Sequence, residues 1–171
     1  MTVVSNTSPL RYLIAAGHAD LVANLFGTVL IPRAVERELL DPHAPASVRE
    51  WLARCPAWIE TRDVHLSPDL EVIGQLHTGE AEAIQLALEL RAEVLVMDER
   101  RGRQLAAARG LTVIGALGML RESYRQGLIQ NPFALAARLR SHGFRCSRAL
   151  MRRFEEQIQE LQRVRVRKED Q

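Results

Sequence analysis

The sequence contains few of the residues that cross-link small extracellular proteins or bind zinc. It has two cysteines, Cys55 and Cys146, and five scattered histidines. Neither cysteine belongs to a CxxC motif, and no two histidines have the spacing of a zinc site, so we interpret both thiols as ordinary side chains. A chain of 171 residues, 47% hydrophobic and 26% charged, is long enough to form a core without disulfides or structural metals.

Long apolar segments and several common enzyme motifs are also absent. The longest apolar runs, such as Val94 to Met97, are far too short to cross a bilayer, and the N-terminus lacks the basic start and apolar stretch of a secretion signal. There is no Walker loop, no GxGxxG after a strand and no GxSxG. We therefore expect a cytoplasmic protein without a membrane partner, whose chemistry depends on neither a P-loop nor a serine nucleophile.

The basic residues are almost all arginine, and most lie in the second half of the chain. Lys168 is the only lysine among 23 basic residues. Residues 1–85 carry a net charge of −5 and residues 86–171 a net charge of +7. Arginine binds phosphate through a planar group with two parallel donors, so an anionic polymer such as RNA is a candidate partner. The alternative is that these arginines serve only solubility.

Short apolar runs alternate with helical patterns along the chain. The predicted strands are residues 3–6, 29–31, 58–61, 93–97 and 111–114, and the predicted helices are residues 7–16, 32–40, 48–53, 79–90 and 100–109. We expect Thr7 and Thr78 to cap the helices that follow them. This order favours a parallel sheet covered by helices, followed by a basic helical tail. No linker divides the chain, so we expect a single domain of residues 1–171, with a core of about 1–130 and an extension of about 131–171.

Polar residues follow two of the predicted strands. Asn6 comes after Val3 and Val4, and Asp98 and Glu99 come directly after the strand at residues 93–97. Because open parallel sheets bind ligands beyond the carboxyl ends of their strands, these residues are candidates for a functional site. The alternative is that Asn6 and Asp98 cap the helices that begin there.

Two glutamates point toward the protein interior in their predicted helices. At about 100° per residue, Glu80 shares the direction of the apolar residues of its helix, whereas Glu82 points the opposite way. Glu38 lies at the edge of an apolar stripe, whereas Glu36 is turned away. An inward carboxylate is costly unless it is paired, hydrogen-bonded or bound to a metal. The alternatives are that Glu80 stabilises its helix N-terminus and that Glu38 pairs with an arginine.

Together Asn6, Glu38, Glu80 and Asp98 form a set of oxygen ligands without cysteine or histidine. Hard ligands of this kind suit Mg²⁺ or Mn²⁺, which retain several waters and bridge to phosphate oxygens. The set therefore favours phosphodiester chemistry.

Five segments, in order, resemble the PIN-domain family, and in particular its toxin-like (VapC-like) branch, whose first strand runs into Asn-Thr-Ser-Pro-Leu. The segments are residues 4–10, 31–39, 79–84, 97–106 and 110–120. The resemblance implies a PIN-like three-layer α/β/α sandwich with a mainly parallel central sheet. It also implies a Mg²⁺-dependent endoribonuclease that is the toxin of a toxin–antitoxin pair, forms a homodimer and is neutralised by a small antitoxin protein.

By this resemblance Glu38, Glu80 and Asp98 fall on acidic positions of the family motif, and Glu99 is a fourth carboxylate or an alternative to Asp98. In the implied reaction one or two Mg²⁺ ions activate a water molecule and stabilise charge on the scissile phosphate.

The chain also supplies candidates for contacts with the RNA backbone, most of them in its second half. Arg100, Arg101 and Arg103 follow the acidic pair, and Ser8 lies in the first motif. Solvated helix faces are the alternative interpretation of each arginine.

The chain departs from the family pattern at its first acidic position, where the usual residue is Asp and this sequence has Asn6. Asparagine keeps an oxygen in nearly the same place but loses the negative charge, so we expect weaker Mg²⁺ binding. An alternative function is therefore a catalytically weakened PIN-like module that binds RNA or protein. A receiver-type phosphoacceptor is a further alternative, disfavoured because the paired acids before the first helix are missing.

Overall fold

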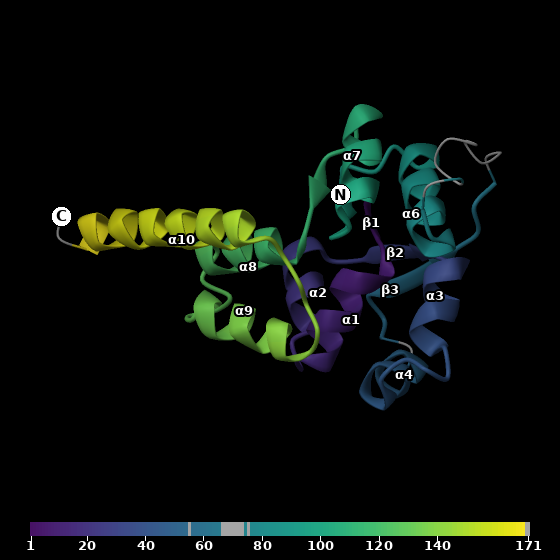
Figure 1. The fold of residues 1–171 in the computed structure, drawn as a ribbon, viewed down its shortest axis with the longest axis horizontal. Coiled ribbons are helices and arrows are strands. Elements are labelled where there is room, and N and C mark those ends of the chain that lie inside the picture. The colour runs from purple at the N-terminus through teal and green to yellow at the C-terminus, as the bar shows by residue number, and fades with distance from the viewer. Residues whose placement is uncertain (55, 66–73, 75, 170–171) are drawn as a thin grey trace.

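Five parallel strands form the centre of the molecule (Figure 1). The computed structural model describes residues 1–54, 56–65, 74 and 76–169, with side chains up to residue 164. The strands are β1 (Val3–Ser5), β2 (Val29–Pro32), β3 (Ile59–Arg62), β4 (Val94–Val96) and β5 (Val113–Ile114). Their order is β3-β2-β1-β4-β5, and every pairing is parallel, with Val4 opposite both Leu30 and Leu95. The sheet is therefore wholly parallel where the sequence predicted a mainly parallel one.

Helices cover both faces of this sheet and confirm the three-layer α/β/α architecture (Figure 1). They are α1 (Thr7–Ala15), α2 (Asp20–Phe26), α3 (Arg33–Leu40), α4 (Ala46–Ala53), α6 (Thr78–Glu89), α7 (Arg100–Ala108), α8 (Ala116–Arg125), α9 (Pro132–Ser141) and α10 (Arg148–Glu169). Successive strand residues face opposite layers, as the pleat requires. Val4 and Leu95 pack with α6 and α7, whereas Val3 and Val96 pack in the larger core with α1, α2 and α8.

The C-terminal helix begins on this larger core and then extends away from it (Figure 1). Phe154 and Ile158 of α10 are 2% and 0% exposed and belong to the same apolar cluster as Leu10 and Leu120. The predicted basic tail thus packs on the sheet domain through its first turns. Among the described residues, no helix is long and apolar enough to cross a membrane.

Most of the predicted elements are confirmed, with differences at their ends and two additions. The sequence did not indicate α2 or α8. Asn6, rather than Thr7, caps α1, because its backbone is extended and its side-chain Oδ1 accepts the Thr7 N–H at 2.6 Å. His77, rather than Thr78, is the residue before α6. Cys146 is a free thiol, whereas Cys55 and the side chain of Lys168 lie outside the described part of the chain.

Candidate active site

A polar pocket of about 650 Å³ lies beyond the carboxyl ends of β1 and β2, next to the start of α6. Because all strands are parallel, their carboxyl ends share one edge of the sheet, where ligands bind in open α/β folds. We call it the acidic pocket; its polar wall includes Asn6, Thr7, Ser8, Glu38, Glu80 and Glu99. Asp41 and Arg11 also line the pocket. Four acids and one arginine give the lining a net charge of −3 when its histidines are neutral.

Glu38 is held on two sides, by α1 and by α6. One carboxylate oxygen accepts a hydrogen bond from the Thr7 hydroxyl, and the other accepts the backbone N–H of Gly79 at 3.0 Å. A Cβ at residue 79 would collide with the Glu38 carboxylate, so only glycine permits this close approach. Among the described residues no ion pair joins Glu38 to an arginine, so the alternative that Glu38 pairs with an arginine is not supported.

Glu80, in the first turn of α6, is 8% exposed. Its carboxylate accepts the backbone N–H of His77 at 3.3 Å, so the expected contact with the start of its own helix does form. Burial raises the pKa of the Glu80 carboxyl above its usual range, and the charges of Glu99 and Glu38 raise it further, against the opposing effect of the His77 contact. Glu80 is therefore close enough to both Glu99 and Glu38 to be repelled by each of them.

Glu99, which immediately precedes α7, meets the first turn of α1. It accepts a hydrogen bond from Asn6 Nδ2 at 2.9 Å and another from the Ser8 hydroxyl. Asn6 is 1% exposed. Its amide thus joins two elements, because Oδ1 accepts from the α1 backbone while Nδ2 donates to the carboxylate.

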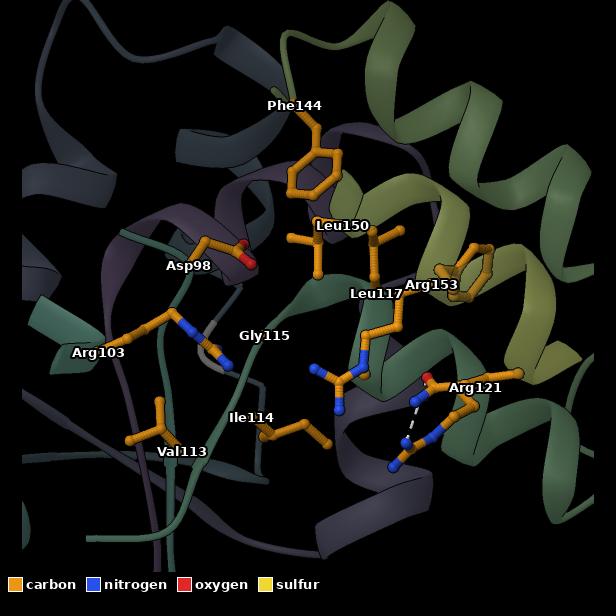
Figure 2. Close-up of a pocket in the computed structure, with 13 residues that line it drawn as sticks. Asp98, Arg103, Val113, Ile114, Gly115, Leu117, Arg121, Phe144, Leu150 and Arg153 are labelled. Atoms are coloured by element: carbon orange, nitrogen blue, oxygen red, sulfur yellow. Dashed lines mark hydrogen bonds between the residues drawn. The ribbon is translucent and has the colours of Figure 1, made fainter. Parts of the chain in front are cut away.

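Asp98 lines a second pocket (Figure 2) and not the acidic pocket that Glu99 lines, as expected for consecutive residues of an extended segment, which point to opposite sides. Its Oδ1 accepts the backbone N–H of Ala116 at 2.8 Å and so stabilises the first turn of α8. Its Oδ2 is buried and accepts no hydrogen bond from the described residues. Burial raises the pKa of the Asp98 carboxyl to about 6, although Arg103 and the Ala116 contact oppose the rise.

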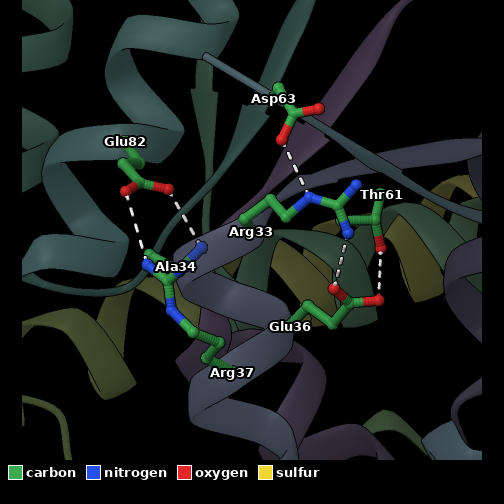
Figure 3. Close-up of polar contacts among 7 residues, drawn as sticks. All are labelled: Arg33, Ala34, Glu36, Arg37, Thr61, Asp63 and Glu82. Carbon is green, nitrogen blue, oxygen red and sulfur yellow. Dashed lines mark hydrogen bonds and ion pairs between the residues drawn. The ribbon is translucent and has the colours of Figure 1, made fainter.

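Glu36 of α3 and Glu82 of α6 connect α3 to the neighbouring elements (Figure 3). Glu82 accepts the backbone N–H of Ala34 at 2.9 Å, in the first turn of α3, which has no side-chain cap of its own. Glu36 accepts the Thr61 hydroxyl of β3 at 2.9 Å, and Arg33 reaches Asp63 at 2.8 Å. These contacts place α3 between α6 and β3, so its inward face presents Glu38 to the pocket.

Comparison with known proteins agrees with this geometry. A family model described as a PIN domain matches residues 2–160. The chain belongs to the PIN-domain family. Among solved structures, a PilT N-terminus domain protein from the hyperthermophilic archaeon Sulfolobus solfataricus P2 is similar in fold, with a TM-score of 0.54 and 22% sequence identity over 72% of this chain and 93% of that one. No curated protein matches the sequence.

PIN domains are typically nucleases and generally use divalent metal ions. In this PIN domain no three carboxylate, imidazole or thiol side chains among the described residues converge as a ready metal cage. The donor set itself nevertheless fits a hard cation, because Glu38, Glu80 and Glu99 line one pocket with oxygen ligands and the charges of Glu38 and Glu99 act on Glu80. Glu38 already accepts a hydrogen bond from the Thr7 hydroxyl. Glu99 already accepts hydrogen bonds from the Ser8 hydroxyl and the Asn6 amide.

The predicted site residues of this PIN domain fall into three groups. The acidic pocket brings together Asn6, Glu38, Glu80, Glu99 and Ser8. Asp98 and Arg103 line a second pocket on the other side of the same segment, where Arg103 donates to the Met97 carbonyl at 2.7 Å. Arg100 and Arg101 are exposed at the start of α7.

Several residues of the acidic pocket were not indicated by the sequence. Thr7, Asp41, His43 and His77 line it, and Thr7 directly contacts Glu38. Asp41 lies one turn after Glu38, and this spacing on one helix face was the available signal. His43 and His77 come from irregular segments, which carry no periodicity to show where a side chain points.

Proposed function

We propose that this PIN domain is a Mg²⁺- or Mn²⁺-dependent endoribonuclease whose active site is the acidic pocket. The observation that carries the proposal is the meeting of Glu38, Glu80 and Glu99, from three separate elements, in a pocket of net negative charge at the carboxyl edge of the sheet. Such oxygen-rich sites suit cations that bridge to phosphate groups. The arginine-rich second half of the chain supports a polyanionic substrate.

In this proposal Glu38, Glu80 and Glu99 would hold the cation. When bound, the ion supplies a Lewis acid that stabilises charge on the phosphate and makes a water molecule a better nucleophile. The hydroxyls of Thr7 and Ser8 orient Glu38 and Glu99. Burial and the neighbouring charges of Glu99 and Glu38 raise the pKa of the Glu80 carboxyl, and a bound cation would offset this repulsion.

A weakened, binding-only module is the second candidate, and Asn6 favours it. The Nδ2 group of Asn6 donates to Glu99, which satisfies part of a charge that a cation would otherwise neutralise. Such a protein would bind RNA through Ser8, Arg100, Arg101 and Arg103 without cleaving it.

We further propose that the protein acts as the toxin of a toxin–antitoxin pair, forms a homodimer and is inhibited by a small antitoxin protein. This part rests on the likeness of the Asn-Thr-Ser-Pro-Leu segment to toxin-like PIN proteins. Induced expression is expected to arrest growth, with relief by co-expression of a small protein encoded beside it. Light scattering at several concentrations tests the dimer.

The nuclease proposal is tested by incubating the purified protein with a mixed, fluorescently labelled RNA pool and Mg²⁺, Mn²⁺ or EDTA. We expect metal-dependent cleavage that is lost in Glu99→Gln and retained in Glu93→Gln, an exposed glutamate outside the pocket. If the native protein is inactive and Asn6→Asp cleaves, the binding-only candidate is correct. Inactivity of every variant with both metals contradicts the nuclease proposal.

A further inference from the structure

A second pocket, of about 320 Å³, lies on the far side of the Asp98–Glu99 segment (Figure 2). Its walls come from the end of β4, from β5 and from α7, α8 and α10. We call it the arginine pocket, because Arg103 of α7, Arg121 of α8 and Arg153 of α10 line it together with Asp98. Three separate helices thus contribute arginines to the lining of one pocket.

The charge of this pocket is opposite to that of the acidic pocket. Three arginines and one carboxylate give the lining a net charge of +2. Figure 2 shows the guanidinium groups of Arg103 and Arg153 reaching toward the middle of the pocket from opposite sides. Asp98 is half-buried and already accepts a backbone N–H, and its single negative charge offsets only one of the three positive charges.

Most donors of these arginines remain available to a ligand. Arg103 uses one N–H for the Met97 carbonyl, and Arg121 makes one long contact of 3.4 Å to Gln157. Arg153 is exposed and forms no hydrogen bond or ion pair with any described residue. Planar guanidinium groups converging from two sides match the geometry of a phosphate, whose oxygens accept pairs of N–H donors.

The two pockets share a wall. Glu99 lines the acidic pocket and Asp98 the arginine pocket, and their Cα atoms are only about 3.8 Å apart across one peptide bond. The acidic pocket lies beyond β1 and β2, whereas the arginine pocket lies against β5 and next to Asp98, which follows β4. Only the Asp98–Glu99 segment therefore separates these parts of the two linings.

We infer that the arginine pocket binds a backbone phosphate of a single RNA strand whose neighbouring phosphodiester lies in the acidic pocket. The inference rests on the proposed function and adds to it the path of the substrate. It assigns Arg121 and Arg153 as RNA-binding residues beside Arg103. It also gives the C-terminal helix a function, since α10 supplies Arg153 and, with Leu150, part of the rim.

The test is fluorescence anisotropy of a short, labelled single-stranded RNA in EDTA, so that binding is measured without cleavage. The variants are Arg121→Gln/Arg153→Gln, the single Arg153→Gln, and Arg152→Gln as the matched control, an exposed neighbour on α10 outside the pocket. We expect the double variant to bind at least about tenfold more weakly, because charge-assisted contacts are lost. Its slope of log affinity against log salt is expected to fall by about 0.7 for each phosphate released.

Arg152→Gln is expected to bind like the native protein. The inference is overturned if the double variant binds RNA as tightly as Arg152→Gln, or if the native protein does not bind the RNA. A labelled poly-glutamate peptide of equal charge serves as the second probe. If the double variant weakens binding of this peptide but not of the RNA, the inference is overturned and the pocket binds an acidic protein segment instead. Circular dichroism checks the folding of each variant. If the double variant unfolds, the comparison of Arg153→Gln with Arg152→Gln decides the test, because both substitutions are at exposed positions. Cleavage by the native protein with Mg²⁺ is scored separately, so failure of the nuclease proposal is distinguishable from failure of this one.

Discussion

Asn6 has the most unusual combination of contacts among the residues of the acidic pocket. It is almost fully buried, and its amide accepts a hydrogen bond from α1 while donating one to Glu99. An aspartate at this position could accept but not donate, so it would face Glu99 as a second negative charge. The asparagine therefore stabilises the pocket without a cation, and an aspartate would make the pocket depend on one.

We expect Asn6→Asp to lower the free energy of unfolding by about 1–3 kcal/mol in EDTA, because a charged hydrogen bond is replaced by repulsion. Mg²⁺ is expected to recover most of this loss and to raise the melting temperature more than it does for the native protein. Thermal unfolding with EDTA and with Mg²⁺ measures both effects. Asn24→Asp, at an exposed position on α2, is the control and is expected to show neither.

Asp98 gives the protein a stability that depends on pH. Its pKa of about 6 in the folded state is above its ordinary value of 3.8, so the native state holds the proton more tightly than the unfolded chain. The contribution of this group is therefore fully present below the unfolded pKa of 3.8 and is lost as the pH rises through about 6. Above pH 7, Asp98→Asn is expected to raise the free energy of unfolding by about 1–3 kcal/mol.

Urea unfolding between pH 4 and pH 8 measures this difference. The native protein is expected to lose stability between about pH 4 and pH 6, whereas Asp98→Asn should lack this component and retain the hydrogen bond to Ala116. Asp20→Asn, at an exposed position, is the comparison. Equal pH profiles for the native protein and Asp98→Asn would contradict the account of this carboxyl group.

The sequence predicted the directions of individual side chains well within helices and less well at strand ends. Helix phase placed Glu38 and Glu80 inward, and the structure has both in the acidic pocket. It left Asp98 and Glu99 as alternatives, because β4 ends at Val96 and the direction of each following residue depends on the irregular segment before α7. The folded structure distinguishes them, because Glu99 accepts a hydrogen bond from Asn6 and Asp98 accepts one from the first turn of α8.

At the scale of elements, the contact between α3 and α6 depends on Gly79. Alanine is ordinarily better than glycine in a helix by up to about 1 kcal/mol. Here a Cβ would collide with the Glu38 carboxylate, so we expect Gly79→Ala to destabilise the fold by about 1–3 kcal/mol instead. Chemical denaturation measures the effect, and the double variant Gly79→Ala/Glu38→Ala is expected to be at least as stable as Glu38→Ala alone. Persistent destabilisation in the double variant would show that the collision is not the cause.

The first turns of α10 are part of the core, and a cavity there should be costly. Ile158→Ala is expected to lower the free energy of unfolding by about 2–4 kcal/mol, because a fully buried side chain is truncated. Leu150→Ala, on the same helix but with a side chain 48% exposed, is expected to cost about 0.5 kcal/mol or less. Urea unfolding of both variants tests this, and equal losses would mean that α10 does not pack as described.

The two elements that the sequence did not indicate have physical reasons for their weak signals. Helix α8 begins at Ala116 after a glycine and contains Gly118, whose missing Cβ makes room for Ile114. Its first N–H is satisfied by Asp98, 18 residues earlier in the chain, so no local cap marks its start. Helix α2 has only seven residues, no side-chain cap and a glycine at its end. Tertiary contacts, rather than local pattern, define both.

At the scale of the whole molecule, charge is divided between two pockets. The sequence showed that its two halves carry opposite net charge and predicted an anionic partner. It could not show that the acids and the arginines meet on the two sides of Asp98 and Glu99, because α3, α6, α8 and α10 converge there only in the folded chain. The proposed path of RNA follows from this convergence.

The most direct test of the central claim compares Glu99→Gln with Asp98→Asn in metal-dependent cleavage of labelled RNA, with circular dichroism to check folding. If the acidic pocket is the active site, Glu99→Gln abolishes cleavage at every Mg²⁺ and Mn²⁺ concentration, whereas Asp98→Asn keeps at least about a tenth of the native rate, since it leaves the pocket intact. Loss of cleavage in Asp98→Asn together with full activity in Glu99→Gln would contradict the account, because the chemistry would then lie on the other side of this segment.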